Sequence, residues 1–210
     1  MKTAIISTLV LVLFIPLSAH ANLLVNPSFE STGGWSTSSS GHWDMVASGD
    51  SGISTPYGDY MMKYSTTSNT LYTGFSQGMD ASPNATYSIS GYYNIPTELW
   101  HGYHTYAYIY YMAEGGTSPI KIESVGSFSD PTDGWMHFSA SSTAPEEAVR
   151  AVLTVAVGVS GGYPDPLGEQ VLYWDNLYFA RDEVIPEASS ITLLSIGIAG
   201  LVMFSRMKRS

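Results

Sequence analysis

The sequence contains no cysteine and few charged residues. Without cysteine, the protein has no disulfide framework, no thiolate nucleophile and no metal site held by sulfur. Charged residues make up 12% of the 210 residues, whereas about 25% is usual for soluble domains. A chain of this length can still bury a substantial core, so we expect one domain of moderate size with additional segments at its ends.

Basic residues are the scarcest group in the middle of the chain. Half of the eight lie close to the chain ends: Lys2, Arg206, Lys208 and Arg209. The other half lie between them: Lys63, Lys121, Arg150 and Arg181. Because all eighteen acidic residues also lie there, this region carries a net charge of about −14. Double-stranded nucleic acid needs a basic binding surface, so it is excluded as a partner.

The N-terminus has the three parts of a secretory signal peptide. Lys2 provides a positive charge, and a short apolar run follows over residues 4–17. Ala19 and Ala21 then provide the small residues of a cleavage site, so we expect residues 1–21 to be removed. An uncleaved N-terminal anchor is the alternative, but the run is short for a bilayer span.

The C-terminus also has three parts. Pro186 and Glu187 lie in a linker over residues 182–190, and an apolar stretch begins at Ile191. The chain ends in three basic residues: Arg206, Lys208 and Arg209. The apolar stretch is near the minimum of about 17 residues for a membrane helix, and the basic end predicts a cytoplasmic C-terminus.

This order of motif, apolar segment and basic end resembles the PEP-CTERM sorting signal of Gram-negative bacteria that make exopolysaccharide. In that family a Pro-Glu-Pro motif precedes a short transmembrane helix, and a membrane enzyme called exosortase processes the signal. Pro186 and Glu187 match, whereas Ala188 replaces the second proline. The resemblance implies an exported precursor held in the inner membrane by residues 191–210, and then a place at the cell surface or in the extracellular matrix. An ordinary tail anchor is the alternative.

Strand signals recur at short, regular spacing between the two ends, with no sustained helical period. We predict a short strand at Leu23–Val25 and eight longer ones: Asp59–Thr66, Leu71–Gln77, Thr86–Asn94, His104–Met112, Ile120–Phe128, Trp135–Ser141, Val149–Val157 and Val171–Ala180. Clusters of Gly, Pro, Asn and Asp separate them. The succession predicts an all-β antiparallel sandwich over residues 22–181.

Alternation along His104–Met112 assigns its two faces. One face is predicted to lie in the core: Thr105, Ala107, Ile109 and Tyr111. The opposite face carries one histidine and three tyrosines: His104, Tyr106, Tyr108 and Tyr110. Such a surface either binds a ligand or simply covers the sheet.

Several stretches resemble the carbohydrate-binding modules of the family 4/9 type, which are jelly-roll β-sandwiches. Asn22–Glu30 is similar to the opening of those domains, and Tyr173–Tyr178 is similar to their closing segment. Weaker similarity joins them at Tyr60–Lys63, Phe75–Gln77, Thr86–Ser90 and Gly134–Phe138. The resemblance covers nearly the whole predicted sandwich and implies a jelly roll that binds polysaccharide through aromatic side chains.

The resemblance also implies which residues bind ligands. For glycan it indicates Trp43, Tyr92, Asn94, Trp100, His104, Tyr106, Tyr108 and Tyr110. Aromatic rings contact the apolar face of a sugar, and amides and hydroxyls bind its OH groups. For a structural calcium ion it indicates Glu30 and Asp175, whose carboxylates suit this oxygen-preferring ion. The alternative is that Asp175 caps a turn and Glu30 is solvated.

Other motifs give little support for catalysis. His101 and His104 stand at the entry of a predicted strand without further zinc ligands. Acid pairs such as Glu146 with Glu147 fall in predicted loops, where exposed acids are usual. Three hypotheses remain. They are an exported, non-catalytic polysaccharide-binding protein, a structural matrix or biofilm protein without a defined ligand, and, least favoured, a polysaccharide hydrolase or lyase.

Overall fold

The computed structural model describes residues 21–38, 42–67, 72–96, 103–159 and 169–182. The predicted signal peptide up to His20, the sorting motif and the predicted membrane segment lie outside the described residues. Within the described ranges, no helix is long and apolar enough to cross a membrane.

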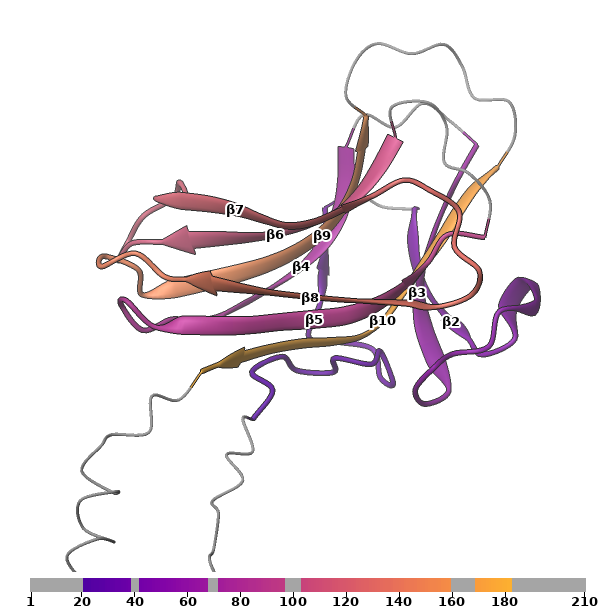
Figure 1. Ribbon diagram of the computed structural model, residues 1–210, viewed down its shortest axis with the longest axis horizontal. Helices are drawn as coiled ribbons and strands as arrows, with labels where there is room; N and C mark the ends of the chain where they lie inside the picture. The colour runs from indigo at the N-terminus through magenta and orange to yellow at the C-terminus, as the bar shows by residue number, and fades with distance from the viewer. Residues whose placement is uncertain (1–20, 39–41, 68–71, 97–102, 160–168, 183–210) are drawn as a thin grey trace, which may run out of the picture.

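The described strands form two antiparallel sheets of five, which pack as the two layers of a sandwich (Figure 1). Sheet A has the order β1 (Ser36–Thr37), β4 (Tyr72–Asp80), β9 (Arg150–Val159), β6 (Tyr103–Met112) and β7 (Lys121–Phe128). Sheet B has the order β2 (Trp43–Ala47), β3 (Tyr60–Thr66), β10 (Gln170–Arg181), β5 (Thr86–Asn94) and β8 (Met136–Thr143). The only helical turn in the described residues is η1 (Asp50–Gly52). The predicted all-β antiparallel sandwich is confirmed.

Two strands were missed and one prediction was wrong. The sequence analysis did not predict β1 or β2, which extend the sandwich on the β4 and β3 sides. The segment Leu23–Val25 is not a strand. The side chain of Gln77 binds both the N–H (2.6 Å) and the C=O (2.8 Å) of Val25, in place of a neighbouring strand.

The first described residues are fastened to the last strand. The Asn22 side chain donates to Leu177 O (2.9 Å) and accepts from Phe179 N (3.1 Å). The Leu23 N–H also donates to Phe179 O (2.8 Å). The two ends of the sandwich therefore lie next to each other, as Figure 1 shows.

The core lies between the sheets and is rich in aromatic rings. Trp174 of β10 is fully buried, packs edge to face against Phe138 (5.5 Å), and donates its indole N–H to Thr105 Oγ1 (3.0 Å). The predicted core face of β6 is confirmed, since its four side chains are completely buried. Because β6 alternates strictly, its other face points away from sheet B.

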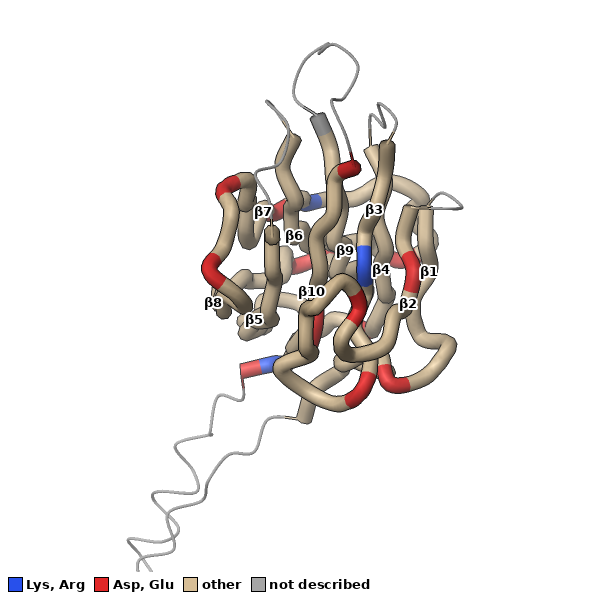
Figure 2. Tube along the Cα trace, turned by 90° about the vertical axis from the view of Figure 1, so that its right-hand side faces the viewer, with Lys and Arg blue, Asp and Glu red and all other residues tan. Residues whose placement is uncertain are grey.

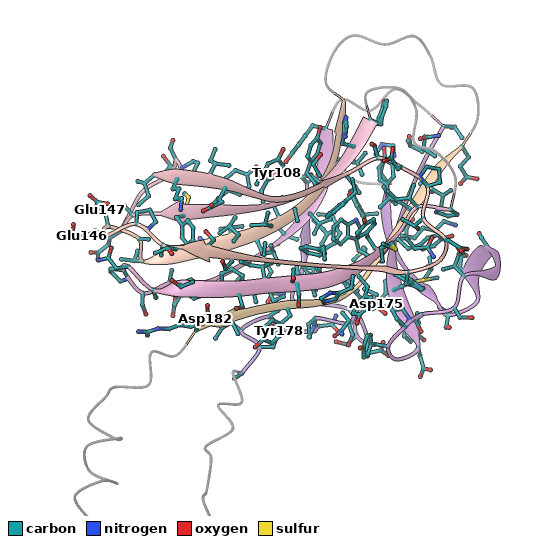
Figure 3. The ribbon with its side chains drawn as sticks, viewed as in Figure 1. Tyr108, Glu146, Glu147, Asp175, Tyr178 and Asp182 are labelled. Carbon is teal, nitrogen blue, oxygen red and sulfur yellow. The ribbon has the colours of Figure 1, made fainter. Side chains whose placement is uncertain are left out.

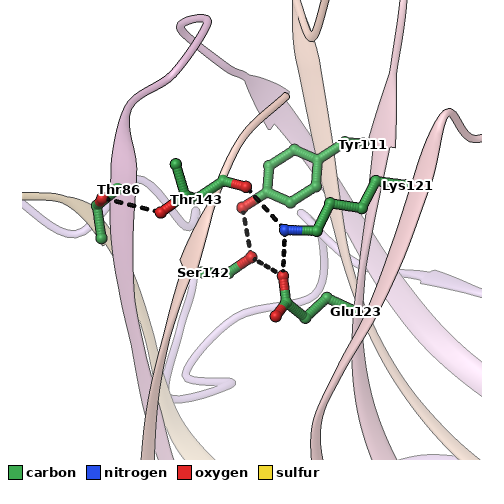
Figure 4. Close-up of polar contacts among 6 residues, drawn as sticks. All are labelled: Thr86, Tyr111, Lys121, Glu123, Ser142 and Thr143. Atoms are coloured by element: carbon green, nitrogen blue, oxygen red, sulfur yellow. Dashed lines mark hydrogen bonds and ion pairs between the residues drawn. The ribbon is translucent and has the colours of Figure 1, made fainter. Parts of the chain in front are cut away.

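A polar network connects the edge strands of the two sheets (Figure 4). Ser142 of β8 accepts a hydrogen bond from the Tyr111 hydroxyl (3.0 Å) and donates one to Glu123 (2.6 Å). Lys121 pairs with Glu123 (2.6 Å) and donates to Thr143 O (2.9 Å). These contacts hold β7 against β8, which belong to different sheets.

Negative charge is spread over the loops and edges of the domain (Figure 2). Among the described residues, Lys63 is paired with Asp50 (2.8 Å) and Lys121 with Glu123. Arg150 and Arg181 are the only other lysine or arginine residues in the described part of the chain, so the surface has little positive charge to attract a polyanion.

Candidate functional site

Three tyrosines form a continuous aromatic surface on the outward face of β6. We call Tyr106, Tyr108 and Tyr110 the tyrosine row; all three are partly exposed. Neighbouring ring centroids lie 5.4 Å and 6.2 Å apart. The ring of His104 lies 5.6 Å from that of Tyr106 and extends the row. Figure 3 shows Tyr108 on the side of sheet A that faces away from sheet B.

The face that carries the tyrosine row is concave. In Figure 1, β4, β6 and β9 bend away from sheet B at one end, so sheet A is curved and its outer face lies on the inner side of the bend. The residues that pair with the row are small or uncharged: Ala156, Thr154 and Val152 on β9, and Ser127, Ser124 and Ile122 on β7. The residues that pair directly with the row are therefore uncharged, and the nearest basic group is the Arg150 side chain, which lies over Gly78 beside Val152.

Small residues let the aromatic rings lie close to the sheet. A Cβ atom at Gly158 would lie 3.0 Å from the Tyr72 ring and 3.5 Å from the Tyr106 ring. Gly158 pairs with Tyr72 on one side and with His104 on the other. Glycine at this position therefore leaves space for two tyrosine rings over the same point of the sheet.

Tyr72, which the sequence analysis did not single out, belongs to the same surface. It lies on β4 and is 50% exposed, and its hydroxyl lies 3.5 Å from that of Tyr110. Burial is the main cause that raises the pKa of Tyr72, and its hydrogen bond with Tyr110 raises it further. Burial also raises the pKa of Tyr106 and Tyr108. These hydroxyls are therefore neutral hydrogen-bonding groups at physiological pH.

The other residues predicted to bind glycan lie elsewhere. Trp43 is buried in the core between Tyr64 (5.1 Å) and Phe75 (4.8 Å), so it offers no free ring face. Asn94 is also buried, because Thr132 in the loop after β7 contacts it (3.4 Å). We therefore remove both from the candidate site. Trp100 lies outside the described residues.

Tyr92 lies on the outer face of sheet B, in a second aromatic group. Its hydroxyl lies 3.3 Å from that of Tyr57, and its ring lies 4.9 Å from that of His137. Tyr92 belongs to β5 and the tyrosine row to β6, which are in different sheets. One ligand-binding face cannot include both.

Glu30 and Asp175, the predicted calcium ligands, both hold the loop before β3. Asp175 Oδ2 accepts from Tyr57 N (3.3 Å), and the Glu30 carboxylate accepts from Asp59 N (2.9 Å) and Tyr60 N (3.2 Å). Gly58 lies between these donors with a φ of 68°, and a Cβ atom there would overlap the Glu30 carboxylate. Residues far apart in sequence thus meet at one loop.

The environment of Asp175 suits a cation. Its side chain is completely buried, and no basic side chain of the described residues pairs with it. The pKa of Asp175 is raised to about 7, mainly by burial; the nearby charge of Glu30 also raises it, whereas the hydrogen bonds from Asn176 N and Tyr57 N lower it. Calcium prefers carboxylate and carbonyl oxygens, so these residues fit the ion. The described residues offer no group of three acidic or histidine side chains, so backbone carbonyls or water would complete the shell.

Comparison with known proteins gives the fold. No family model matches the sequence, and no curated protein is similar to it. A xylan-binding domain of carbohydrate-binding module family 22 has a TM-score of 0.53 and 16% identity, covering 77% of this chain and 96% of that chain. A family 61 module in complex with β-1,4-galactotriose has a TM-score of 0.51 and 17% identity, covering 77% and 99%.

A longer protein contains the same fold. The enzymatically active domain of tailspike protein 4 from bacteriophage CBA120 has a TM-score of 0.54 and 16% identity. The match covers 77% of this chain but only 21% of the phage chain. The described domain therefore has the jelly-roll fold of carbohydrate-binding modules, which also occurs as one part of larger proteins.

Proposed function

We propose that this chain is an exported, non-catalytic protein that binds polysaccharide on the concave face of sheet A. The observation that supports this most directly is the tyrosine row, which is partly exposed, uncharged and flanked by small polar and apolar residues. Aromatic rings contact the C–H face of sugars, and neutral hydroxyls exchange hydrogen bonds with sugar OH groups. The face therefore combines both kinds of contact that a sugar chain needs.

The arrangement of the row favours a chain over a single sugar. Three rings follow one another along β6 at centroid spacings of 5.4 Å and 6.2 Å, so successive sugar units can each contact a ring. The similar modules are described as binding xylan or β-1,4-galactotriose. By analogy we propose a neutral, linear polysaccharide, either the cell's own exopolysaccharide or one from its surroundings.

Export and sorting complete the proposal. Signal cleavage after Ala21 would release the domain from the plasma-membrane machinery, and the C-terminal helix would hold the precursor in the inner membrane. Exosortase-type processing near Pro186 and Glu187 would then place the domain at the cell surface or in the matrix. Calcium bound by Glu30 and Asp175 would fix the opening segment of the domain against β10 and the loop before β3.

The test is binding of the purified full-length chain to an array of plant and bacterial polysaccharides. We expect Tyr108→Ala to lower affinity for the bound polysaccharide about tenfold, in line with the loss of one ring contact. Tyr57→Ala is the matched control, because Tyr57 is 46% exposed but packs against Tyr92 of sheet B. Equal binding by both variants and the parent chain would contradict the proposed face.

A structural matrix protein without a defined ligand is the second candidate. The observation in its favour is that the Tyr72 hydroxyl lies 3.5 Å from that of Tyr110, so one polar group of the row already contacts a protein side chain. If the face has no ligand, no polysaccharide on the array will bind the parent chain, and removal of the ring by Tyr72→Ala will not create binding. Binding that depends on Tyr108 would contradict this second candidate.

A further inference from the structure

A cavity of about 330 Å³ lies at the connection between β7 and β8, the edge strands of the two sheets. Its walls come from the ends of β5 and β7, the start of β8 and the loop 129–135. Figure 1 shows this loop crossing from sheet A to sheet B. None of the lining residues belongs to the tyrosine row. The cavity is thus separate in composition from the face proposed above.

Hydrogen bonds hold the wall of this cavity in place. Thr132, in the middle of the loop, donates its N–H to Ile95 O (2.9 Å) and accepts from Ile95 N through its hydroxyl (2.9 Å). At the end of the loop, the Trp135 indole N–H donates to Ser54 O (2.7 Å). A loop fastened at both points keeps its shape without a ligand, so the cavity is preformed.

The lining combines an aromatic surface with acidic groups. Tyr93 and Phe128 are partly exposed and stack on each other, with centroids 4.1 Å apart. Asp130 and Asp133 flank Thr132 and form no ion pair with any described residue. Ser127, Ser129 and Thr132 also line the cavity, and no lysine or arginine contributes to the lining.

We propose that this cavity binds one uncharged sugar unit, presented as the end of a glycan chain. Its volume is at the lower limit of about 300 Å³ for ligand sites, which suits a single ring better than the interior of a chain. The aromatic surface can contact the C–H face of the sugar, and two carboxylates can accept hydrogen bonds from adjacent OH groups. The same carboxylates repel uronic acids and sulfated sugars.

The test uses saturation-transfer difference NMR on the full-length chain with methyl glycosides of D-xylose, D-galactose and D-glucose, and with D-glucuronic acid. We expect transfer to at least one neutral glycoside and none to the glucuronate. Asp130→Asn with Asp133→Asn should weaken the binding about tenfold or more, because both charged acceptors are lost. The matched control is Glu146→Gln with Glu147→Gln, which removes the same charge from exposed positions at the other end of the domain (Figure 3).

Four further results decide the proposal. Ser129 lines the cavity directly after β7, so the larger side chain of Ser129→Phe should fill the cavity and abolish saturation transfer to the neutral glycosides. Tyr108→Ala should leave this transfer unchanged. Loss of the signal with Tyr108→Ala would place the sugar on the tyrosine row and overturn the second site. Absence of transfer to all three neutral glycosides would also overturn the proposal. It would be overturned as well if the Asp130 and Asp133 substitutions abolished binding of calcium but left sugar binding unchanged.

Discussion

Asp175→Asn tests the calcium proposal, because we expect the variant to be more stable than the parent chain without calcium and less stable with it. The completely buried carboxyl of Asp175 has a pKa of about 7, against an ordinary value of 3.8, so keeping it ionised without a cation costs about 4 kcal/mol. A raised carboxyl pKa means that stability falls as the pH rises from about 4 to about 7. At about pH 8 with EDTA, this cost is fully present.

Asp175→Asn removes the charge but keeps an oxygen that can accept from Asn176 N (2.6 Å in the parent protein). The weaker bond from Tyr57 N is lost, at a cost of about 1 kcal/mol. We therefore expect the variant to be about 3 kcal/mol more stable than the parent chain in EDTA, which corresponds to about 6–12 °C in Tm.

Calcium should reverse this order. At a concentration of about 1,000 times the Kd, calcium should stabilise the parent chain by about 4.1 kcal/mol, which exceeds the difference in EDTA, and leave Asp175→Asn nearly unchanged. Differential scanning calorimetry with EDTA or calcium measures both effects, and Asp44→Asn, at an exposed position on β2, is the control. The reasoning is refuted if Asp175→Asn is less stable than the parent in EDTA, or if calcium raises the Tm of both equally.

Three other predictions concern the sheets. Gly158→Val should push the Tyr72 and Tyr106 rings off sheet A. We expect the free energy of unfolding, measured in urea, to fall by about 1–3 kcal/mol and the affinity for polysaccharide to fall as well. If neither quantity changed, the described packing of the rings would be contradicted. Glu123→Gln should cost about 1–2 kcal/mol, because Ser142 and Lys121 lose their charged partner, whereas Glu147→Gln should cost almost nothing. The hydrogen bond from Lys63 is the main cause that lowers the pKa of Asp50 in the folded protein. Ionised Asp50 therefore stabilises the fold above its ordinary pKa of 3.8, and this contribution is lost as the pH falls through the lowered pKa of the folded state. Asp50→Asn should therefore lower the Tm at neutral pH, and an equal loss in strong acid would contradict this explanation.

Local alternation was enough to predict the sandwich and the faces of β6. Strands such as β5 and β6 repeat with a period of two, and this period indicates which side chains face the opposite sheet. The missed strands had weaker signals: β1 has two residues, and β2 follows a stretch rich in Ser and Gly. Their pairing depends on β4 and β3, which lie later in the sequence.

The errors in the candidate site have the same origin. Trp43 resembles a loop aromatic in the sequence, but β2 turns it onto Phe75 of the opposite sheet. Asn94 is on the outward side of β5 by alternation, yet the loop after β7 covers it. Tyr72 of β4 contacts Tyr110 of β6 across β9, the strand between them. Such contacts between distant segments leave no local pattern to detect.

The fastening of Asn22 to β10 brings the entry and exit of the domain to one point. A unit with adjacent ends can be placed inside a surface loop of a host protein without stretching either partner. The sandwich could thus be inserted into another protein as an intact domain, and it would carry both of its proposed sugar-binding surfaces. A force applied through its two ends would first open the Asn22 hydrogen bonds at the edge of the fold, before it reached the aromatic core.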